Sequence, residues 1–91
     1  MESLKAKLRR GEAIFGTMVS LFERSQIACI MKSAGFDFFI LDCEHGPFDY
    51  GRLAGILLLA KETGIPALVR VPEPRREVIL KSMEMGAHGV L

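Results

Sequence analysis

Apolar residues along the chain gather in four short runs, each of which predicts a β-strand. The runs lie at residues 13–19, 36–42, 67–71 and 88–91. The second reads Phe-Asp-Phe-Phe-Ile-Leu-Asp and is too short for an isolated helix. Its nearly continuous apolar character is typical of a strand that is buried on both faces. The first run contains Gly16, where we expect another backbone or a ligand to approach closely.

The stretches between these runs have the spacing of amphipathic helices. Ser3 is a suitable N-cap for a short peripheral helix that reaches Arg10. Three longer helices follow, and glycines after them provide left-handed caps. Their expected buried positions are Ile27, Ile30, Met31 and Ala34 in the first of these helices, Leu53, Ile56, Leu57 and Ala60 in the second, and Ile79 and Met83 in the third.

The predicted strands and helices alternate, and strand starts near residues 13, 36, 66 and 88 recur every 22 to 30 residues. This spacing fits the β/α unit of a (β/α)8 TIM barrel, in which right-handed crossovers make the strands parallel. Because Leu91 falls within an apolar strand, we interpret residues 1–91 as a single partial domain. It is the truncated N-terminal half of such an α/β barrel, with about four β/α units. A doubly wound sheet of flavodoxin type is the alternative, although it would be a small example of that fold.

Composition excludes several classes of protein. Twelve basic and eleven acidic residues give a net charge of +1, which does not indicate binding to nucleic acid or to an anionic membrane surface. The apolar runs are far shorter than the roughly 18 residues that suggest a membrane span, and the N-terminus lacks the apolar core of a secretory signal. We therefore expect a cytoplasmic protein without nucleic-acid or membrane partners, whose two cysteines stay reduced.

Ionisable side chains follow the second and third predicted strands. Asp42, Glu44 and His45 stand at the carboxyl end of the second strand, and Arg70 lies close to the end of the third. Because parallel strands place their carboxyl ends on one face, we expect these side chains to converge there, together with Ser20 from the first strand. Histidine can take and return a proton near neutral pH, and an adjacent carboxylate can fix its tautomer. Arginine can bind a carboxylate or a developing enolate oxygen.

Each of these residues also has a purely structural interpretation. The polar group after the second strand can be a hydrogen-bonded loop, and Arg70 can form an ion pair with Asp42 or Glu44. Cys43 is not assigned a catalytic role, because adjacent side chains at a strand end turn apart. His88 begins a strand, at the face of a barrel associated with stability. The cysteines and histidines lack the paired close spacing of a structural zinc site, and the sequence contains no glycine-rich phosphate loop.

In their order and spacing, several motifs resemble those of the HpcH/HpaI aldolases, a family of class II, metal-dependent pyruvate aldolases. The resemblance covers essentially the whole chain. The motifs are Leu4 to Gly11 with Gly16-Thr17, then Ala34 to Asp37, Leu41 to Pro47, Val69 to Pro72 and Gly86 to Val90. The related citrate lyase β-subunit group shares the barrel and is the nearest alternative.

The resemblance implies reversible cleavage of a 4-hydroxy-2-oxo acid or a 2-oxo-3-deoxy sugar acid into pyruvate and an aldehyde. In the family a divalent metal, Mg²⁺ or Mn²⁺ and sometimes Co²⁺ or Zn²⁺, chelates the 2-oxo acid and acts as a Lewis acid on the enolate. By the same resemblance, His45 is the acid/base residue, Asp42 is its hydrogen-bonded partner, and Arg70 contacts the pyruvate oxygen. Glu44 matches the motif without an assigned role.

The family's metal ligands, a glutamate and an aspartate, lie beyond the fourth strand, so the resemblance implies no metal ligand within residues 1–91. It also implies a homo-oligomer. One alternative is that residues 1–91 form a non-catalytic piece, either a truncated product or an interaction module. A half-barrel would leave two sheet edges and apolar helix surface open, so we expect the isolated chain to be oligomeric or poorly folded. A further alternative is a different barrel enzyme that acts on a carboxylate or a phosphate.

Overall fold

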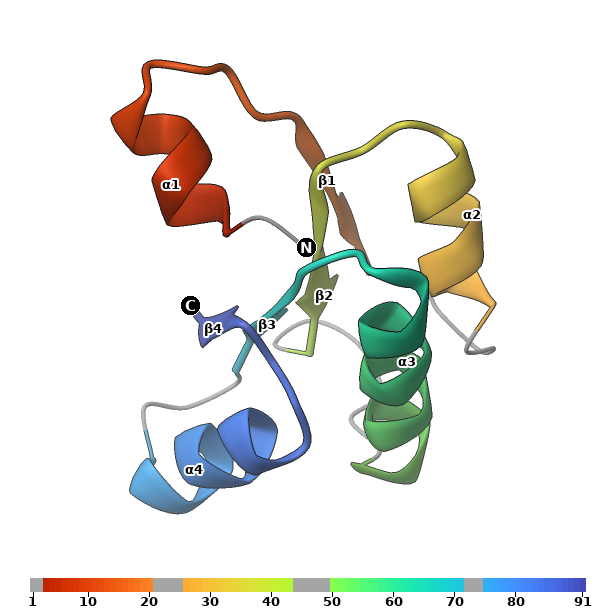
Figure 1. The fold of residues 1–91 in the computed structure, drawn as a ribbon. Helices are drawn as coiled ribbons and strands as arrows, with labels where there is room; N and C mark the ends of the chain where they lie inside the picture. The colour runs from red at the N-terminus through yellow and green to blue at the C-terminus, as the bar shows by residue number, and fades with distance from the viewer. Residues whose placement is uncertain (1–2, 21–25, 44–49, 72–74) are drawn as a thin grey trace.

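The computed structural model describes residues 3–20, 26–43, 50–71 and 75–91, in which helices and strands alternate (Figure 1). In chain order the elements are α1 (Leu4–Arg9), β1 (Gly16–Val19), α2 (Ile27–Ser33), β2 (Phe38–Asp42), α3 (Tyr50–Thr63), β3 (Ala67–Arg70), α4 (Arg76–Glu84) and β4 (Gly89–Val90). The strands form one sheet in the order β1-β2-β3-β4, and every pair is parallel. The predicted alternation and the predicted strand direction are both confirmed.

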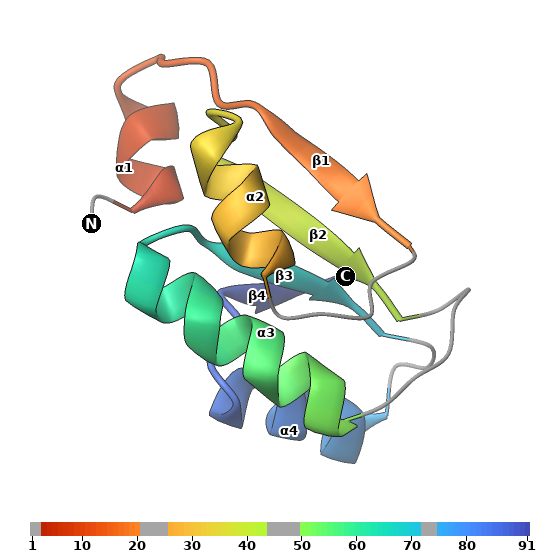
Figure 2. The ribbon, with the colours of Figure 1, turned by 90° about the vertical axis from the view of Figure 1, so that its right-hand side faces the viewer.

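The register of the sheet places strand residues on two faces. Leu41 is paired with Val19 on one side and with Val69 on the other, and residues paired in this way share a face. That face contains the core, and α2 and α3 lie in front of it in Figure 2. The opposite face, called here the open face, contains Met18 and Ile40, and Met18 is 43% exposed. The prediction that β2 is buried on both faces is therefore confirmed for the face that the helices cover and only in part for the open face, where Phe38 and Ile40 are half-buried and Asp42 is buried.

Helix α3 confirms the predicted apolar stripe. Its buried residues are Leu53, Ile56, Leu57 and Ala60. Their spacing places them on one side of the helix, where they join the core. Gly64 follows the helix with φ at +82°, a conformation that glycine adopts at little cost, and its N–H donates to the carbonyl of Ala60 at 2.9 Å.

Helix α2 is rotated relative to the predicted stripe. Ala28 is its fully buried residue, and Ile27 and Met31 pack partly against the core. Ile30 is 57% exposed and Ala34 is also exposed, so these two predicted core positions were wrong. The small side chain of Ala28 lets this side of α2 pack closely, because it fills little space between the backbones.

Helix α4 also differs from its prediction. Ile79 packs partly against the core, as expected, but Met83 is 44% exposed and was wrongly predicted to point inward. Ser82 is buried in its place. Its hydroxyl donates to the carbonyl of Val78 at 2.9 Å. This hydrogen bond within the helix satisfies the hydroxyl, so its burial costs little free energy.

Strand β1 starts later than predicted because residue 15 has other partners. The N–H of Phe15 donates to Oδ2 of Asp37 at 2.8 Å, and the carbonyl of Phe15 accepts from the N–H of Asp37 at 2.7 Å. Phe36, the predicted start of the second strand, instead donates its N–H to the carbonyl of Met31 at the end of α2. The regular pairing therefore begins with Gly16 and Phe38.

Helix α1 is peripheral, as predicted, and contains no buried residue. The hydroxyl of Ser3 caps it by accepting from the N–H of Ala6 at 3.1 Å. Figure 2 shows α1 near the amino ends of the strands, where Nζ of Lys7 lies 3.3 Å from Oδ1 of Asp37. None of the helices in the described residues is long and apolar enough to cross a membrane.

Candidate functional site

Asp42 and Arg70 are the last residues of β2 and β3, and the register pairs them directly. Both lie on the open face, since Ile40 and Leu68, two residues earlier in each strand, are also paired. Nη1 of Arg70 lies 3.8 Å from Oδ2 of Asp42, which is an ion-pair distance rather than a short hydrogen bond. The predicted convergence of these two side chains at the carboxyl ends of neighbouring strands is therefore observed.

Burial differs sharply between the two partners. The side chain of Asp42 is 4% exposed and that of Arg70 is 33% exposed. A carboxylate buried to this extent is expensive unless a cation or hydrogen-bond donors accompany it, and Arg70 supplies a charge that cannot be lost by deprotonation. The structural interpretation of Arg70, an ion pair with Asp42, thus describes the contact that is present. The same contact places a partly exposed cation at the face where parallel α/β folds bind their ligands.

Met18 is a neighbour of Arg70 that sequence reasoning did not single out. Its Sδ lies 3.9 Å from Nη1 of Arg70, although Met18 is on β1 and Arg70 on β3. The arginine side chain therefore crosses the open face of β2. A methionine in an apolar strand gives no sign of such a role, but strand alternation places Met18 on the open face, as the register partner of Ile40. Ser20, which was also expected to converge here, follows β1 and is exposed.

His45 and Glu44 lie outside the described residues, so their predicted positions remain predictions. Cys43, directly before them, is 2% exposed and belongs to the core cluster. Burial, and to a smaller extent the charge of Asp42, raises the pKa of the Cys43 thiol to about 11. Because the thiolate is the nucleophilic form, this environment opposes a catalytic role for Cys43, in agreement with the sequence analysis.

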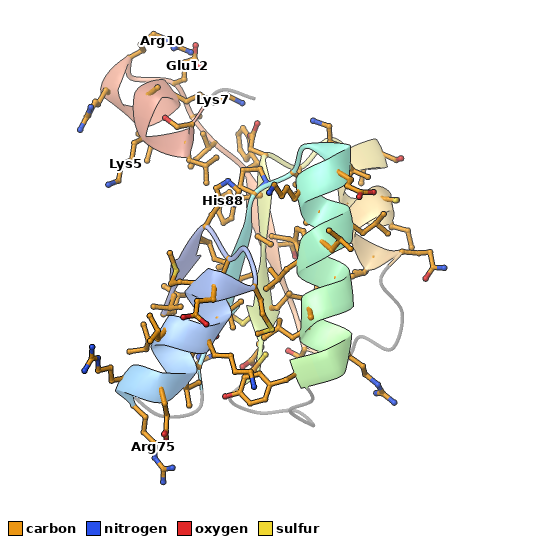
Figure 3. All side chains as sticks on the ribbon, turned by 60° about the horizontal axis from the view of Figure 1, so that its bottom comes forward. Lys5, Lys7, Arg10, Glu12, Arg75 and His88 are labelled. Carbon is orange, nitrogen blue, oxygen red and sulfur yellow. The ribbon has the colours of Figure 1, made fainter. Side chains whose placement is uncertain are left out.

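The amino ends of the strands carry different features. His88 is exposed and precedes β4, its N–H donates to the carbonyl of Ala67 at 2.8 Å, and Figure 3 shows it on the side of α1. A cavity of about 290 Å³ also lies here, and its lining includes Lys7, Lys32 and Asp37. Since Asp42 and Arg70 stand at the opposite ends of the strands, this cavity is separate from the candidate site.

Within the described residues, no group of three or more His, Cys, Asp or Glu side chains could hold a metal ion. Asp42, the buried carboxylate of the site, already lies beside the cation of Arg70. These residues therefore do not form a binding site for the divalent metal that the resemblance implies, and no metal position follows from them.

Comparison with known proteins adds an independent line of evidence, although no family model matches the sequence. A hydroxypyruvate/pyruvate aldolase of Roseobacter denitrificans is 31% identical over 91 residues, which are 100% of this chain and 35% of the relative. The crystal structure of an HpcH/HpaI aldolase from Desulfitobacterium hafniense has a TM-score of 0.89 and 36% identity, over 96% of this chain and 34% of that one. The crystal structure of the citrate synthase SbnG has a TM-score of 0.88 and 30% identity, over 97% of this chain and 36% of that one.

The chain thus spans about a third of the length of these proteins. Over that third, the order of the elements, the parallel sheet and the sequence agree together. The predicted partial (β/α)8 barrel and the predicted resemblance to the HpcH/HpaI aldolases are therefore both confirmed over this part of their length.

Proposed function

We propose that the complete protein containing this chain is a metal-dependent aldolase that reversibly cleaves a 4-hydroxy-2-oxo acid or a 2-oxo-3-deoxy sugar acid into pyruvate and an aldehyde. The observation that supports this most directly is the pairing of Arg70 with Asp42 at the carboxyl ends of β2 and β3. The relative from Roseobacter denitrificans, a hydroxypyruvate/pyruvate aldolase, supports the choice of pyruvate as the shared product.

The proposed reaction requires one base and one electrophile. The base removes the proton of the 4-hydroxyl, the bond between C3 and C4 breaks, and the aldehyde leaves. The electron pair of that bond forms the enolate of pyruvate, with its charge on the former keto oxygen, and C3 then takes up a proton. In this proposal His45 transfers the protons, and the guanidinium of Arg70 binds the oxygen whose charge grows.

Arg70 suits the electrophilic role for two reasons that the structure supports. Its charge is permanent, and its side chain is partly exposed on the open face, where a substrate can reach it. Asp42 lies beside Arg70 and only three residues before His45 in the sequence. We propose that Asp42 orients the imidazole of His45 and partly neutralises Arg70, so that the guanidinium does not hold the pyruvate product too tightly.

The divalent metal of this proposal supplies Lewis-acid stabilisation of the enolate when it is bound. The described residues contain no suitable cluster of ligands. In line with the resemblance, its ligands are proposed to lie beyond the fourth strand in the complete protein.

The test measures pyruvate release by the complete protein from a 4-hydroxy-2-oxo acid, with added Mg²⁺ or Mn²⁺ and with a chelator. Removal of the metal, His45→Ala and Arg70→Ala are each expected to lower kcat at least about a hundredfold. His88→Ala and Arg10→Ala are the matched controls, because they remove the same kinds of group near α1, as Figure 3 shows. Unchanged rates with the chelator and in both site variants would refute the proposal.

A second candidate is citrate synthesis, which the likeness to the citrate synthase SbnG favours. Formation of a carbon–carbon bond also uses an enolate, so the same arginine would serve it. Assaying the same protein for citrate formation separates the two candidates, because an aldolase of the proposed kind releases pyruvate and forms no citrate.

A further inference from the structure

The guanidinium of Arg70 is contacted from two different strands. Nη1 lies 3.8 Å from Oδ2 of Asp42 on β2 and 3.9 Å from Sδ of Met18 on β1. Arg70 is the last residue of β3. Its side chain therefore crosses the open face over β2 and reaches β1. Both contacts are made by the same nitrogen, and both partners lie on the open face.

The thioether of Met18 is a weak acceptor, yet its position on β1 allows it to orient the guanidinium of Arg70. The side chain of arginine has several rotatable bonds, and fixing them costs conformational entropy. The contact between Nη1 of Arg70 and Oδ2 of Asp42, at 3.8 Å, is longer than a directional hydrogen bond, so this contact attracts the charge more than it orients it. The polarizable sulfur of Met18 adds a second fixed point on the other side of β2.

We propose that Met18 is a positioning residue, which keeps the guanidinium of Arg70 extended across the open face in the orientation that meets the 2-oxo acid. This inference rests on the proposed function, in which Arg70 binds the oxygen whose charge grows in the transition state. Loss of the correct orientation should then affect the transition state more than the bound substrate. It should therefore lower kcat more than it raises KM.

The experiment uses the complete protein and compares Met18→Leu with Met83→Leu. Met18 and Met83 are almost equally exposed, at 43% and 44%, but Met83 lies on α4, away from the open face. Met18→Leu keeps the size and removes the acceptor, so kcat should fall about three- to tenfold while KM changes less than about twofold. Met83→Leu should leave both constants unchanged.

Two further variants test whether the effect passes through Arg70. Met18→Gln restores an acceptor on a side chain of similar length, so its kcat should exceed that of Met18→Leu. In an Arg70→Ala background, Met18→Leu should cause no additional loss, because the group that it positions is absent. Equal losses of kcat with and without Arg70, or a Met18→Leu variant as active as the wild type, would overturn the positioning role.

A spectroscopic measurement separates this inference from the proposed function. With methionine methyl groups labelled with ¹³C, Arg70→Ala should shift the resonance of Met18 and leave that of Met83 in place. A wild-type protein that releases no pyruvate would overturn the proposed function even if Met18 shifts. An unshifted Met18 resonance would overturn the contact itself, whatever the activity.

Discussion

The ring of Phe38 on β2 lies directly against Gly16 on β1. The two residues are register partners, and a Cβ built on Gly16 would stand 2.6 Å from Cε1 of Phe38, far inside the contact distance of two carbons. Gly16 is not among the glycines with positive φ. Lack of space, rather than backbone conformation, therefore requires glycine here. The close approach expected at Gly16 is thus present, but it is made by an aromatic side chain of the next strand and not by the backbone or ligand that was predicted.

Gly16→Ala is therefore expected to lower the free energy of unfolding of the complete protein by about 1–3 kcal/mol, because the new methyl group overpacks this contact. Urea denaturation measures the change. The smaller side chain in Phe38→Leu should reduce the cost of adding Gly16→Ala. An equal cost in both backgrounds would show that the ring is not the cause.

Local sequence patterns predicted some elements well because a regular apolar stripe by itself decides which side of a helix is buried. Helix α3 follows its apolar stripe, since three large apolar residues and one alanine line a single side of the helix and determine which side is buried. Helix α2 departs from its stripe because Ala28 faces the core and Ile30 does not, which depends on how closely other elements approach. The start of β1 depends on Asp37, whose carboxylate binds an N–H 22 residues earlier in the chain.

The candidate site shows the same division. Asp42 and Arg70 could be found from the sequence, because a charged residue at the end of an apolar strand is unfavourable to bury unless it has a partner or a functional role. Met18 could not be found, because an apolar residue in a strand is indistinguishable from one that fills the core. Its contact with Arg70 depends on the order of three strands, which places Met18 and Arg70 on either side of β2.

Asp37 is expected to make stability depend on acid pH. The N–H of Phe15, and secondarily the side chain of Lys7, lowers the pKa of Asp37 below its usual value of 3.8. Because its pKa is lower in the folded state, ionised Asp37 stabilises the fold fully at pH values above its unfolded-state pKa. This stabilisation is lost as the pH falls through the folded-state pKa. Asp37→Asn should therefore lower the urea midpoint near neutral pH, and its difference from the wild type should shrink as the pH falls below 3.8.

The control for this prediction is Glu12→Gln. Oε1 of Glu12 lies 2.9 Å from Nη2 of Arg10, but both side chains are about half exposed, so solvent screens their attraction. This variant should leave the urea midpoint unchanged. An acid dependence that persists undiminished in Asp37→Asn would mean that other groups cause it.

Cys43 is expected to resist alkylation in the folded protein. With its pKa raised to about 11, its thiolate is scarce at pH 8, and its side chain is 2% exposed. Iodoacetamide should therefore label the half-buried Cys29 faster than Cys43, as measured by mass spectrometry of the labelled peptides. In urea both should react at similar rates. Labelling of Cys43 as fast as that of Cys29 without urea would contradict the described burial.

Asp42→Asn separates the two tasks proposed for this carboxylate. The substitution keeps the shape of the side chain and removes its charge, so Arg70 keeps a neighbour but loses its counter-charge at 3.8 Å. If Asp42 orients His45, kcat for pyruvate release should fall about tenfold to a hundredfold, because the imidazole loses its fixed tautomer. KM should stay the same or decrease, since a less neutralised Arg70 attracts the anionic substrate more strongly.

Asp37→Asn is the control for this prediction, because it removes a carboxylate at the other end of the same sheet and should leave both constants unchanged. A raised KM with unchanged kcat would instead mean that Asp42 acts only by holding Arg70 in place.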